Sequence, residues 1–270
     1  MIGRGIGSGF AAARDFLARG LVRLGVRPNW LTVGGMAITA AAGVCYALGV
    51  GRQFAWTLRS GASPNAYLLL GGGLLVLASA CDMLDGAVAR LGTHSSVFGQ
   101  FLDSMLDRFS DFAVYSGIAI GYAVQGPANI TFVLLSMLSF VNAFMISYAK
   151  ARAENLIASC PVGYWQRGER SAAILIATFA HNIPALVIQQ AMLPLLTVVR
   201  RILYTRAVMA GKSPPLDPRA GRWWLKVRLW RWPRMTVPYD LVTGLNIAWL
   251  IFAPIPAYDV LRQLAEVVST

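Results

Sequence analysis

The most constraining feature of this sequence is a series of long, nearly uninterrupted apolar stretches. Examples are 30–50, 67–80 and 130–146. A helix needs about 20 residues to cross the hydrocarbon core of a bilayer, so stretches of this length predict several membrane spans. The composition agrees, because 56% of the 270 residues are hydrophobic and only 13% are charged. We therefore expect an all-α integral membrane protein.

Turn and breaker residues divide the chain into six expected transmembrane helices. Gly126 and Pro127 form a tight turn, and Pro184 forbids a regular helix through the last connection. Before the first span, residues at about 3–24 combine apolar side chains with arginines, which suits an amphipathic helix lying in the headgroup region. The six spans are expected at about 30–50, 66–91, 97–124, 129–150, 170–182 and 185–207.

The excess of basic residues indicates membrane topology and argues against nucleic-acid binding. The formal charge is +12, from 24 Lys and Arg against 12 Asp and Glu. The basic residues cluster between the apolar stretches, as expected for cytoplasmic loops beside anionic lipid. They place the N-terminus, the 91–96 turn, the 150–170 loop and the segment after 207 in the cytoplasm. The opposite side carries only Arg52 and Arg59, so we expect a multi-pass protein of the cell (cytoplasmic) membrane.

We expect one membrane domain over residues 1–208 and a C-terminal extension over residues 209–270. The first part of the extension, 209–236, is rich in Arg, Lys, Trp and Pro, a composition typical of the membrane interface. The stretch that follows, 237–258, is apolar but contains Asp240. It is either a seventh span or a helix packed at the interface, and we favour a seventh helix.

Four aspartates stand out in this apolar chain, two at the end of the second expected span and two in the third. Asp82 and Asp85 are spaced i, i+3, and Asp103 and Asp107 are spaced i, i+4, so each pair projects from one face of its helix. Because the connection at 91–96 is short, the two helices are expected to be antiparallel neighbours. The two acidic faces can then converge near the cytoplasmic side.

Four carboxylates brought together would repel one another, and ionisable groups at membrane depth are rare and usually functional. Oxygen ligands without His or Cys favour Mg²⁺ or Mn²⁺ over zinc, and two such ions suit phosphate chemistry. The small residues Gly86 and Ala89 leave room for a ligand to approach the backbone, and Gly99 permits close helix packing. The alternative interpretation is that the acids are solvated helix ends, paired with the cations Arg90, Arg108 and Lys150.

The aspartates form a longer pattern with fixed gaps, Asp82-x2-Asp85-Gly86-x2-Ala89-Arg90-x8-Gly99-x3-Asp103-x3-Asp107. This pattern resembles the complete signature of the CDP-alcohol phosphotransferase family of membrane enzymes, and the resemblance covers roughly residues 10–208. It implies a six-helix homodimer that uses divalent metal. It also implies transfer of a phosphatidyl group from CDP-diacylglycerol to an alcohol, with release of CMP.

The resemblance also implies roles for individual residues. Asp82, Asp85 and Asp103 would ligate metal, and Asp107 would contact a second ion and act as general base on the acceptor hydroxyl. The nucleotide site would be lined by Gly86, Ala89, Arg90 and Gly99. Two residues at the start of the first span, Asn29 and Thr32, resemble the family's segment near the cytidine, although they also suit a helix cap.

Basic residues at the cytoplasmic ends of the later spans suggest a phosphorylated acceptor alcohol, because arginine matches phosphate oxygens. The strings at 147–154 and 166–170 resemble those of bacterial phosphatidylinositol phosphate synthases, so inositol phosphate is the expected acceptor. Family members often have proline where this chain has Gly168. Phosphatidylglycerol phosphate synthases also bind a phosphorylated acceptor, and the same cations also suit lipid headgroups. The acceptor-site candidates are Lys150, Arg152, Arg170 and Arg201.

The main interpretation from another functional class is a cation transporter, because intramembrane acids also build cation pathways. Transporters commonly show internal repeats or matched broken helices, and none is evident here. One further acid, Asp111, extends the face of Asp103 and Asp107 by another turn. We interpret it as orienting a neighbour such as Arg108, and we place it outside the catalytic set.

Overall fold

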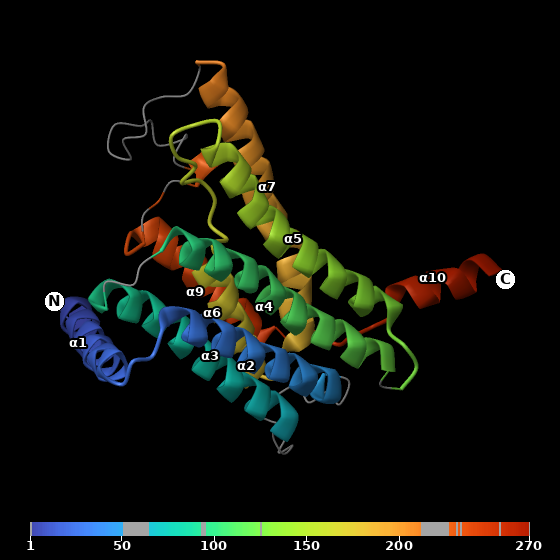
Figure 1. Cartoon of the computed structure of the whole chain (residues 1–270). Helices are drawn as coiled ribbons and strands as arrows, with labels where there is room; N and C mark the ends of the chain where they lie inside the picture. Colours follow the sequence, from blue (N-terminus) through green and yellow to red (C-terminus); the bar gives the residue numbers. More distant parts are fainter. Residues whose placement is uncertain are drawn as a thin grey trace.

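The computed structural model describes residues 2–50, 65–92, 96–124, 126–211, 227–230, 232, 234–253 and 255–269, with the backbone alone described for 2–10 and 269. Every long regular element in these ranges is a helix, as the sequence predicts (Figure 1). The helices are α1 (Ile2–Arg23), α2 (Pro28–Gly49), α3 (Ala66–Leu91), α4 (Val97–Val124), α5 (Ile130–Glu154), α6 (Arg167–Phe179), α7 (Ile183–Met209), α9 (Val237–Phe252) and α10 (Val260–Ser269).

Each of the six expected spans coincides with one of the helices α2 to α7. Four of them, α2, α3, α5 and α7, have the length and apolar composition needed to cross a membrane. Helix α4 has 28 residues but carries charged side chains in its first half. Helix α6 has only 13 residues, which cover about 20 Å of the roughly 30 Å that hydrocarbon requires. The membrane-protein character is therefore clear, whereas the count of six spans stays a prediction.

Local residue chemistry explains where the helices begin and end. Pro28 opens α2, where its missing N–H costs nothing. Asn65 caps α3, because its side-chain oxygen accepts hydrogen bonds from the backbone N–H groups of Tyr67 and Leu68. Asn129 caps α5 in the same way. Pro184 lies in the first turn of α7, so the predicted break between the fifth and sixth segments is confirmed.

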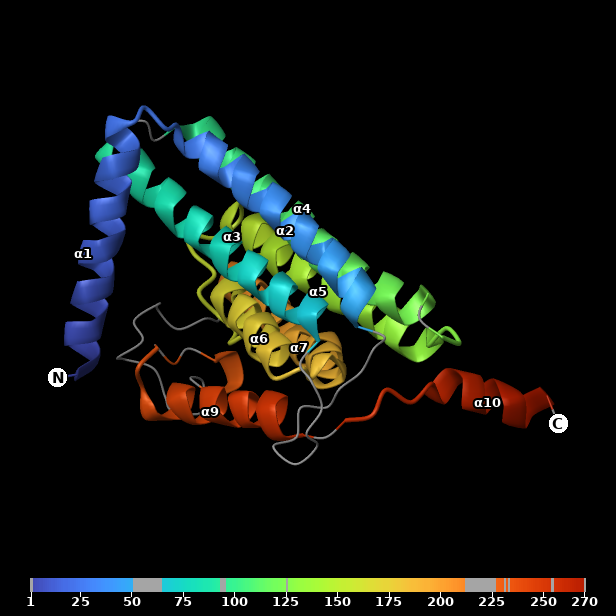
Figure 2. The same cartoon turned by 90° about the horizontal axis from the view of Figure 1, so that it is seen from below.

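Helices α2, α3 and α4 lie side by side, and glycines set their close approach (Figure 2). A side chain at Gly43 would come within 2.5 Å of the Ala113 carbonyl oxygen, and one at Gly117 would collide with the Gly43 carbonyl. Small residues of this kind let membrane helices pack backbone to backbone. This tight crossing fixes α4 against α2, which also packs along α3 on its other side, so the aspartates of α3 and α4 are held in place through α2.

Helix α1 lies across the ends of α2 and α3 at a steep angle to them (Figure 2). Its Ala18 is fully buried and packs with Ala87 and Val88 of α3. The helix predicted at about 3–24 is therefore present. Its location in the lipid headgroup region stays a prediction.

The C-terminal extension packs against the rest of the molecule. Helix α9 covers 237–252 of the stretch predicted as a seventh helix, and it lies against α6 and α7. The chain then leaves helical conformation before α10, a helix that the sequence reasoning did not predict. Asp259 accepts hydrogen bonds from the Ile130 and Thr131 N–H groups at the start of α5. Most of the Trp- and Arg-rich stretch 209–236 lies outside the described residues, as do Arg52, Arg59 and the 93–95 turn.

Candidate active site

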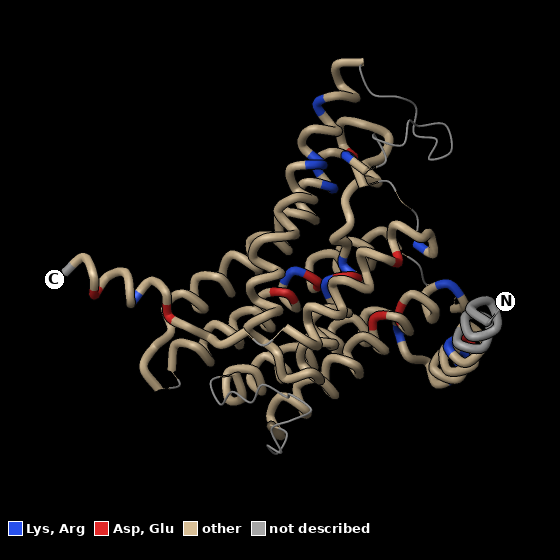
Figure 3. Tube along the Cα trace, turned by 180° about the vertical axis from the view of Figure 1, so that it is seen from behind, with Lys and Arg blue, Asp and Glu red and all other residues tan. Residues whose placement is uncertain are grey.

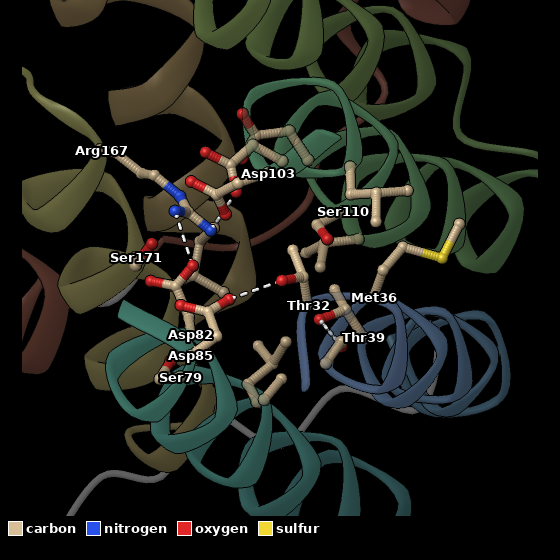
Figure 4. A pocket seen from close by; sticks show the side chains of 18 of the residues that line it. Thr32, Met36, Thr39, Ser79, Asp82, Asp85, Asp103, Ser110, Arg167 and Ser171 are labelled. Atoms are coloured by element: carbon tan, nitrogen blue, oxygen red, sulfur yellow. Dashed lines mark hydrogen bonds and ion pairs between the residues drawn. The ribbon is translucent and has the colours of Figure 1, made fainter. Parts of the chain in front are cut away.

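A cavity of about 300 Å³ opens between α2, α3, α4 and α6 (Figure 4). Apolar residues such as Leu75 and Val114 share its lining with acids, hydroxyls and one arginine. The polar residues that line it are Thr32, Thr39, Ser79, Asp82, Asp85, Asp103, Asp107, Ser110, Asp111, Arg167 and Ser171. Figure 3 shows acidic and basic residues side by side near the centre of the molecule.

Three of the predicted metal ligands converge in this cavity. Asp82, Asp85 and Asp103 each offer a carboxylate oxygen, and these oxygens lie within 4.8 Å of one another. Asp85 is buried and accepts a hydrogen bond of 2.8 Å from the Thr32 hydroxyl. Asp103 Oδ1 is buried and has no hydrogen-bond partner among the described residues. A buried carboxylate oxygen without a donor is unfavourable, and a bound cation would satisfy it, so the donor set fits Mg²⁺ or Mn²⁺.

The fourth aspartate of the motif, Asp107, is held by an arginine from a distant part of the chain. Arg167 Nη2 lies 2.5 Å from Asp107 Oδ1, and Nη1 of the same guanidinium lies 2.9 Å from Asp82 Oδ1. Arg167 therefore bridges α3 and α4 from the first residue of α6, as Figure 4 shows. The sequence reasoning did not select Arg167. The available signal was its i, i+3 spacing from Arg170, which puts both on one helix face.

The five acids of the cavity outnumber the cations that contact them. Arg108 lies 3.5 Å from Asp107 and 4.0 Å from Asp111, and the buried Arg170 lies 3.1 Å from Asp111. Together with Arg167 these are three guanidinium groups against five carboxylates. Among the ion pairs that the structure describes, neither Arg90 nor Lys150 reaches the aspartates. The interpretation of the acids as ordinary paired helix ends therefore leaves excess negative charge, which a divalent cation would balance.

The residues predicted to bind nucleotide lie on α2, α3 and α4, the helices that carry the aspartates or line their cavity. Thr32 lines the cavity itself. A Cβ atom at Gly99 would lie 3.3 Å from Asn29 Oδ1, so α2 and α4 meet at these two residues. A Cβ atom at Gly86 would lie 3.4 Å from Arg90 Nη1. Ala89, on the same helix, is only partly exposed. The arrangement gathers these residues near the start of α2 and α4 and the end of α3.

The four predicted acceptor-site cations occupy different environments. Lys150 and Arg152 are exposed at the end of α5, outside the cavity lining, and Lys150 lies 3.9 Å from Glu154. Arg170 is buried, with Nε and Nη1 lacking a partner among the described residues.

The remaining candidate, Arg201, is also buried, and its guanidinium is hydrogen-bonded to α5 and to the loop between α5 and α6. It donates to the carbonyl oxygens of Val162 and Ile146 and to the Gln166 side chain. Its nitrogens are thus already bonded, and it does not line the cavity. These contacts give Arg201 an evident structural role, and its predicted contact with an acceptor phosphate is untested.

The sequence is similar to those of curated enzymes that make inositol phospholipids. The sequence is 32% identical over 188 residues to the archaetidylinositol phosphate synthase of Methanothermobacter thermautotrophicus, which covers 67% of this chain and 84% of that protein. It is 32% identical over 173 residues to the phosphatidylinositol phosphate synthase of Cutibacterium acnes, which covers 63% of this chain and 74% of that protein.

Solved structures give the same result. The phosphatidylinositol phosphate synthase of Mycobacterium tuberculosis in complex with manganese and citrate matches with a TM-score of 0.60 at 26% identity, over 72% of this chain and 88% of that one. The same enzyme with CDP-DAG bound matches with a TM-score of 0.59 at 26% identity, over 71% and 92%. The family model of CDP-alcohol phosphatidyltransferase matches residues 26–212. The chain therefore belongs to the CDP-alcohol phosphatidyltransferase family.

Proposed function

We propose that this protein transfers the phosphatidyl group of CDP-diacylglycerol to a hydroxyl of inositol phosphate, giving phosphatidylinositol phosphate and CMP. The observation that carries the proposal is the convergence of Asp82, Asp85 and Asp103 in a cavity of a chain of this family. The relatives named as phosphatidylinositol phosphate and archaetidylinositol phosphate synthases support inositol phosphate as the acceptor. They also favour transfer chemistry over a cation transporter.

The aspartates would hold two Mg²⁺ or Mn²⁺ ions, with Asp82, Asp85 and Asp103 as ligands and Asp107 contacting the second ion. When bound, the ions would supply positive charge that neutralises the negative charge of the pyrophosphate oxygens and of the leaving oxygen. The unpartnered oxygen of Asp103 supports this assignment. So does the manganese present in the related enzyme of known structure.

Asp107 would act as general base on the acceptor hydroxyl. An alcohol is a poor nucleophile near neutral pH, so a carboxylate within hydrogen-bond reach is needed to accept its proton. The acceptor oxygen, as it loses its proton to Asp107, would attack the phosphorus that bears the diacylglycerol. The bond from that phosphorus to the bridging oxygen would break, and CMP would leave with the electron pair. Arg167 now occupies Asp107 Oδ1, so it would have to turn toward substrate phosphate before the carboxylate could accept the proton.

The substrates would lie on opposite sides of the aspartates. Asn29, Thr32, Gly86, Ala89, Arg90 and Gly99 would surround the CDP group, and the small residues among them would let the nucleotide approach the backbone. The acceptor phosphate would meet cations from α5, α6 and α7. These are Lys150, Arg152, Arg170 and Arg201, and Arg167 joins them because it lines the cavity.

The placement of the protein in its membrane is part of the same proposal. Six spans, α2 to α7, would cross the cytoplasmic membrane, and the aspartates and the N-terminus would face the cytoplasm. Exposed apolar side chains along the helices, such as Leu70, Val76 and Met137, support contact with lipid. Helix α1 would lie at the interface, α9 would be a seventh helix, and two copies would form a homodimer. The membrane domain would comprise 1–208 and the extension 209–270.

An assay of purified protein in detergent tests the proposed function. We expect Mn²⁺- or Mg²⁺-dependent release of CMP from CDP-diacylglycerol with inositol phosphate as acceptor, and loss of that release in Asp107→Asn. Glycerol phosphate, serine and free inositol are the comparison acceptors. Faster release with glycerol phosphate would make the protein a phosphatidylglycerol phosphate synthase. No CMP release with any acceptor would refute the proposal.

A further inference from the structure

The C-terminal extension lies almost entirely beyond residue 212, where the match to the family model ends, yet it packs along the helix that supplies two arginines to the site. Helix α9 runs beside α6 and α7 (Figure 2). Near its end, the Asn182 side chain in the turn between α6 and α7 donates to the carbonyl oxygens of Leu250 and Ala253, at 3.0 and 2.7 Å. The Trp249 indole N–H donates to the Ala185 carbonyl at 3.1 Å. The extension therefore holds the far end of α6.

At the other end of α6, the extension holds a single buried carboxylate. The Glu169 side chain is 6% exposed, and Arg234 Nη2 lies 2.7 Å from its Oε1. The Tyr239 hydroxyl donates to the same oxygen at 2.5 Å. Nearby, the hydroxyls of Tyr164 and Thr243 are hydrogen-bonded at 3.0 Å. A carboxylate this deeply buried is tolerated only when its partners remain in place, so Glu169 depends on the extension.

The geometry of a helix connects Glu169 to the active site. Residues follow one another by about 100° around the axis, so Glu169 points away from the face shared by Arg167 and Arg170. That inner face contacts Asp82 and Asp107 through Arg167, and Asp111 through Arg170. The first turn of α6 is thus held from both sides.

Gly168 lies between the two sets of contacts. It lines the active-site cavity, and it also lines a second cavity between α6 and α9. A Cβ atom at this position would lie 3.2 Å from Arg234 Nη2. The absence of a side chain therefore lets Arg234 approach the backbone of the residue next to Arg167.

We infer that the extension is a positioning element of the active site: Arg234 and Tyr239 fix Glu169 on the outer face of α6 and so keep Arg167 and Arg170 directed at the aspartates. This inference rests on the proposed function. Without Arg234, Glu169 would be a nearly buried carboxylate that keeps only the Tyr239 hydroxyl among the contacts of the described residues. Because such a carboxylate is unfavourable, the first turn of α6 would shift to expose it to water, and Arg167 and Arg170 would be drawn away from the aspartates.

Three variants test this inference in the full chain: Arg234→Gln, Arg234→Lys, and Arg234→Gln combined with Glu169→Gln. We expect Arg234→Gln to lower kcat about tenfold, which corresponds to about 1.4 kcal/mol. It should also tighten Mn²⁺ binding, because Arg167 is withdrawn from the aspartates. Arg234→Lys should keep most of the activity. The double variant should regain most of it, because no buried charge is left unpaired.

A matched control is Arg262→Gln, which removes an arginine of the same extension from an exposed pair with Glu266 and should change nothing. Unchanged kcat and Mn²⁺ affinity in Arg234→Gln would overturn the inference. The inference would also be overturned if Arg234→Gln lost activity only in proportion to the folded protein lost on gel filtration. In that case its Mn²⁺ affinity would be unchanged, and the added Glu169→Gln substitution would not restore activity. The Mn²⁺ titration uses no substrate, so it decides the inference even if the wild type releases no CMP, an outcome that would refute the proposed function alone.

Discussion

Replacing Arg167 with glutamine is expected to strengthen Mn²⁺ binding to the aspartates and to lower turnover. Arg167 contacts Asp82 at 2.9 Å and Asp107 at 2.5 Å. A cation that enters this cavity competes with the guanidinium group for the same oxygens, and the two positive charges repel one another. The glutamine side chain keeps similar size but carries no charge, so the competition is removed.

The size of the effect follows from the exposure of the two ion pairs. Arg167 and Asp82 are 39% and 41% exposed, and a pair in such contact with water contributes about 0.5 kcal/mol. Asp107 is 12% exposed, and a charged hydrogen bond there contributes about 1.5 to 3 kcal/mol. When Mn²⁺ displaces Arg167 in the wild type, water solvates the released guanidinium and offsets part of the free energy of these two contacts. The net cost of the displacement is then about 1 to 2 kcal/mol. The Kd for Mn²⁺ should then fall about 5- to 30-fold.

Isothermal titration calorimetry of the detergent-purified protein with MnCl₂, without substrates, measures the Kd for Mn²⁺. Release of CMP from CDP-diacylglycerol measures turnover in the same preparation. The control is Arg206→Gln, which removes an exposed arginine from the last turn of α7. An unchanged or weaker Mn²⁺ affinity in Arg167→Gln would refute the reasoning. An equal shift in Arg206→Gln would show that net charge, and not the contact with Asp82 and Asp107, sets the affinity.

Three further predictions address packing, the metal ligands and the extension. Gly117→Ala should destabilise the protein by about 1 to 3 kcal/mol, because its methyl group meets the Gly43 carbonyl; thermal unfolding in detergent measures this, and an unchanged Tm would contradict it. Asp103→Asn should weaken Mn²⁺ binding about tenfold or more in the same titration, and wild-type affinity would exclude Asp103 as a ligand. Although desolvation opposes the shift, hydrogen bonds from Thr131 and neighbouring N–H groups hold the pKa of Asp259 below its usual value. The stabilisation of this contact should be complete above about pH 4 and lost as the pH falls through the lowered pKa. The mobility of a spin label on α10, measured by electron paramagnetic resonance, should rise only in that acid range, and a rise near pH 6 would contradict the assignment.

The sequence determined the features that depend on near neighbours in the chain. Apolar length gave the helices, and Pro28, Asn65 and Pro184 explain boundaries through local backbone chemistry. The convergence of the aspartates of α3 and α4 was predictable from the sequence, because helical periodicity and one short connection leave few possible arrangements of the two helices. The four spans with sufficient apolar length were recognisable for the same reason.

Only the tertiary structure decided which cations meet those acids. Arg167 reaches Asp82 from 85 positions away in the sequence, and Arg201 turns out to bond carbonyl oxygens inside the protein. The packing of the extension on Glu169 was likewise not predictable from amino-acid composition, which indicated only that residues 209–236 form an interfacial segment. An arginine at a membrane face can serve lipid, loop or site equally well by its chemistry. Its partner is fixed by how distant helices pack, and that depends on contacts across the whole fold.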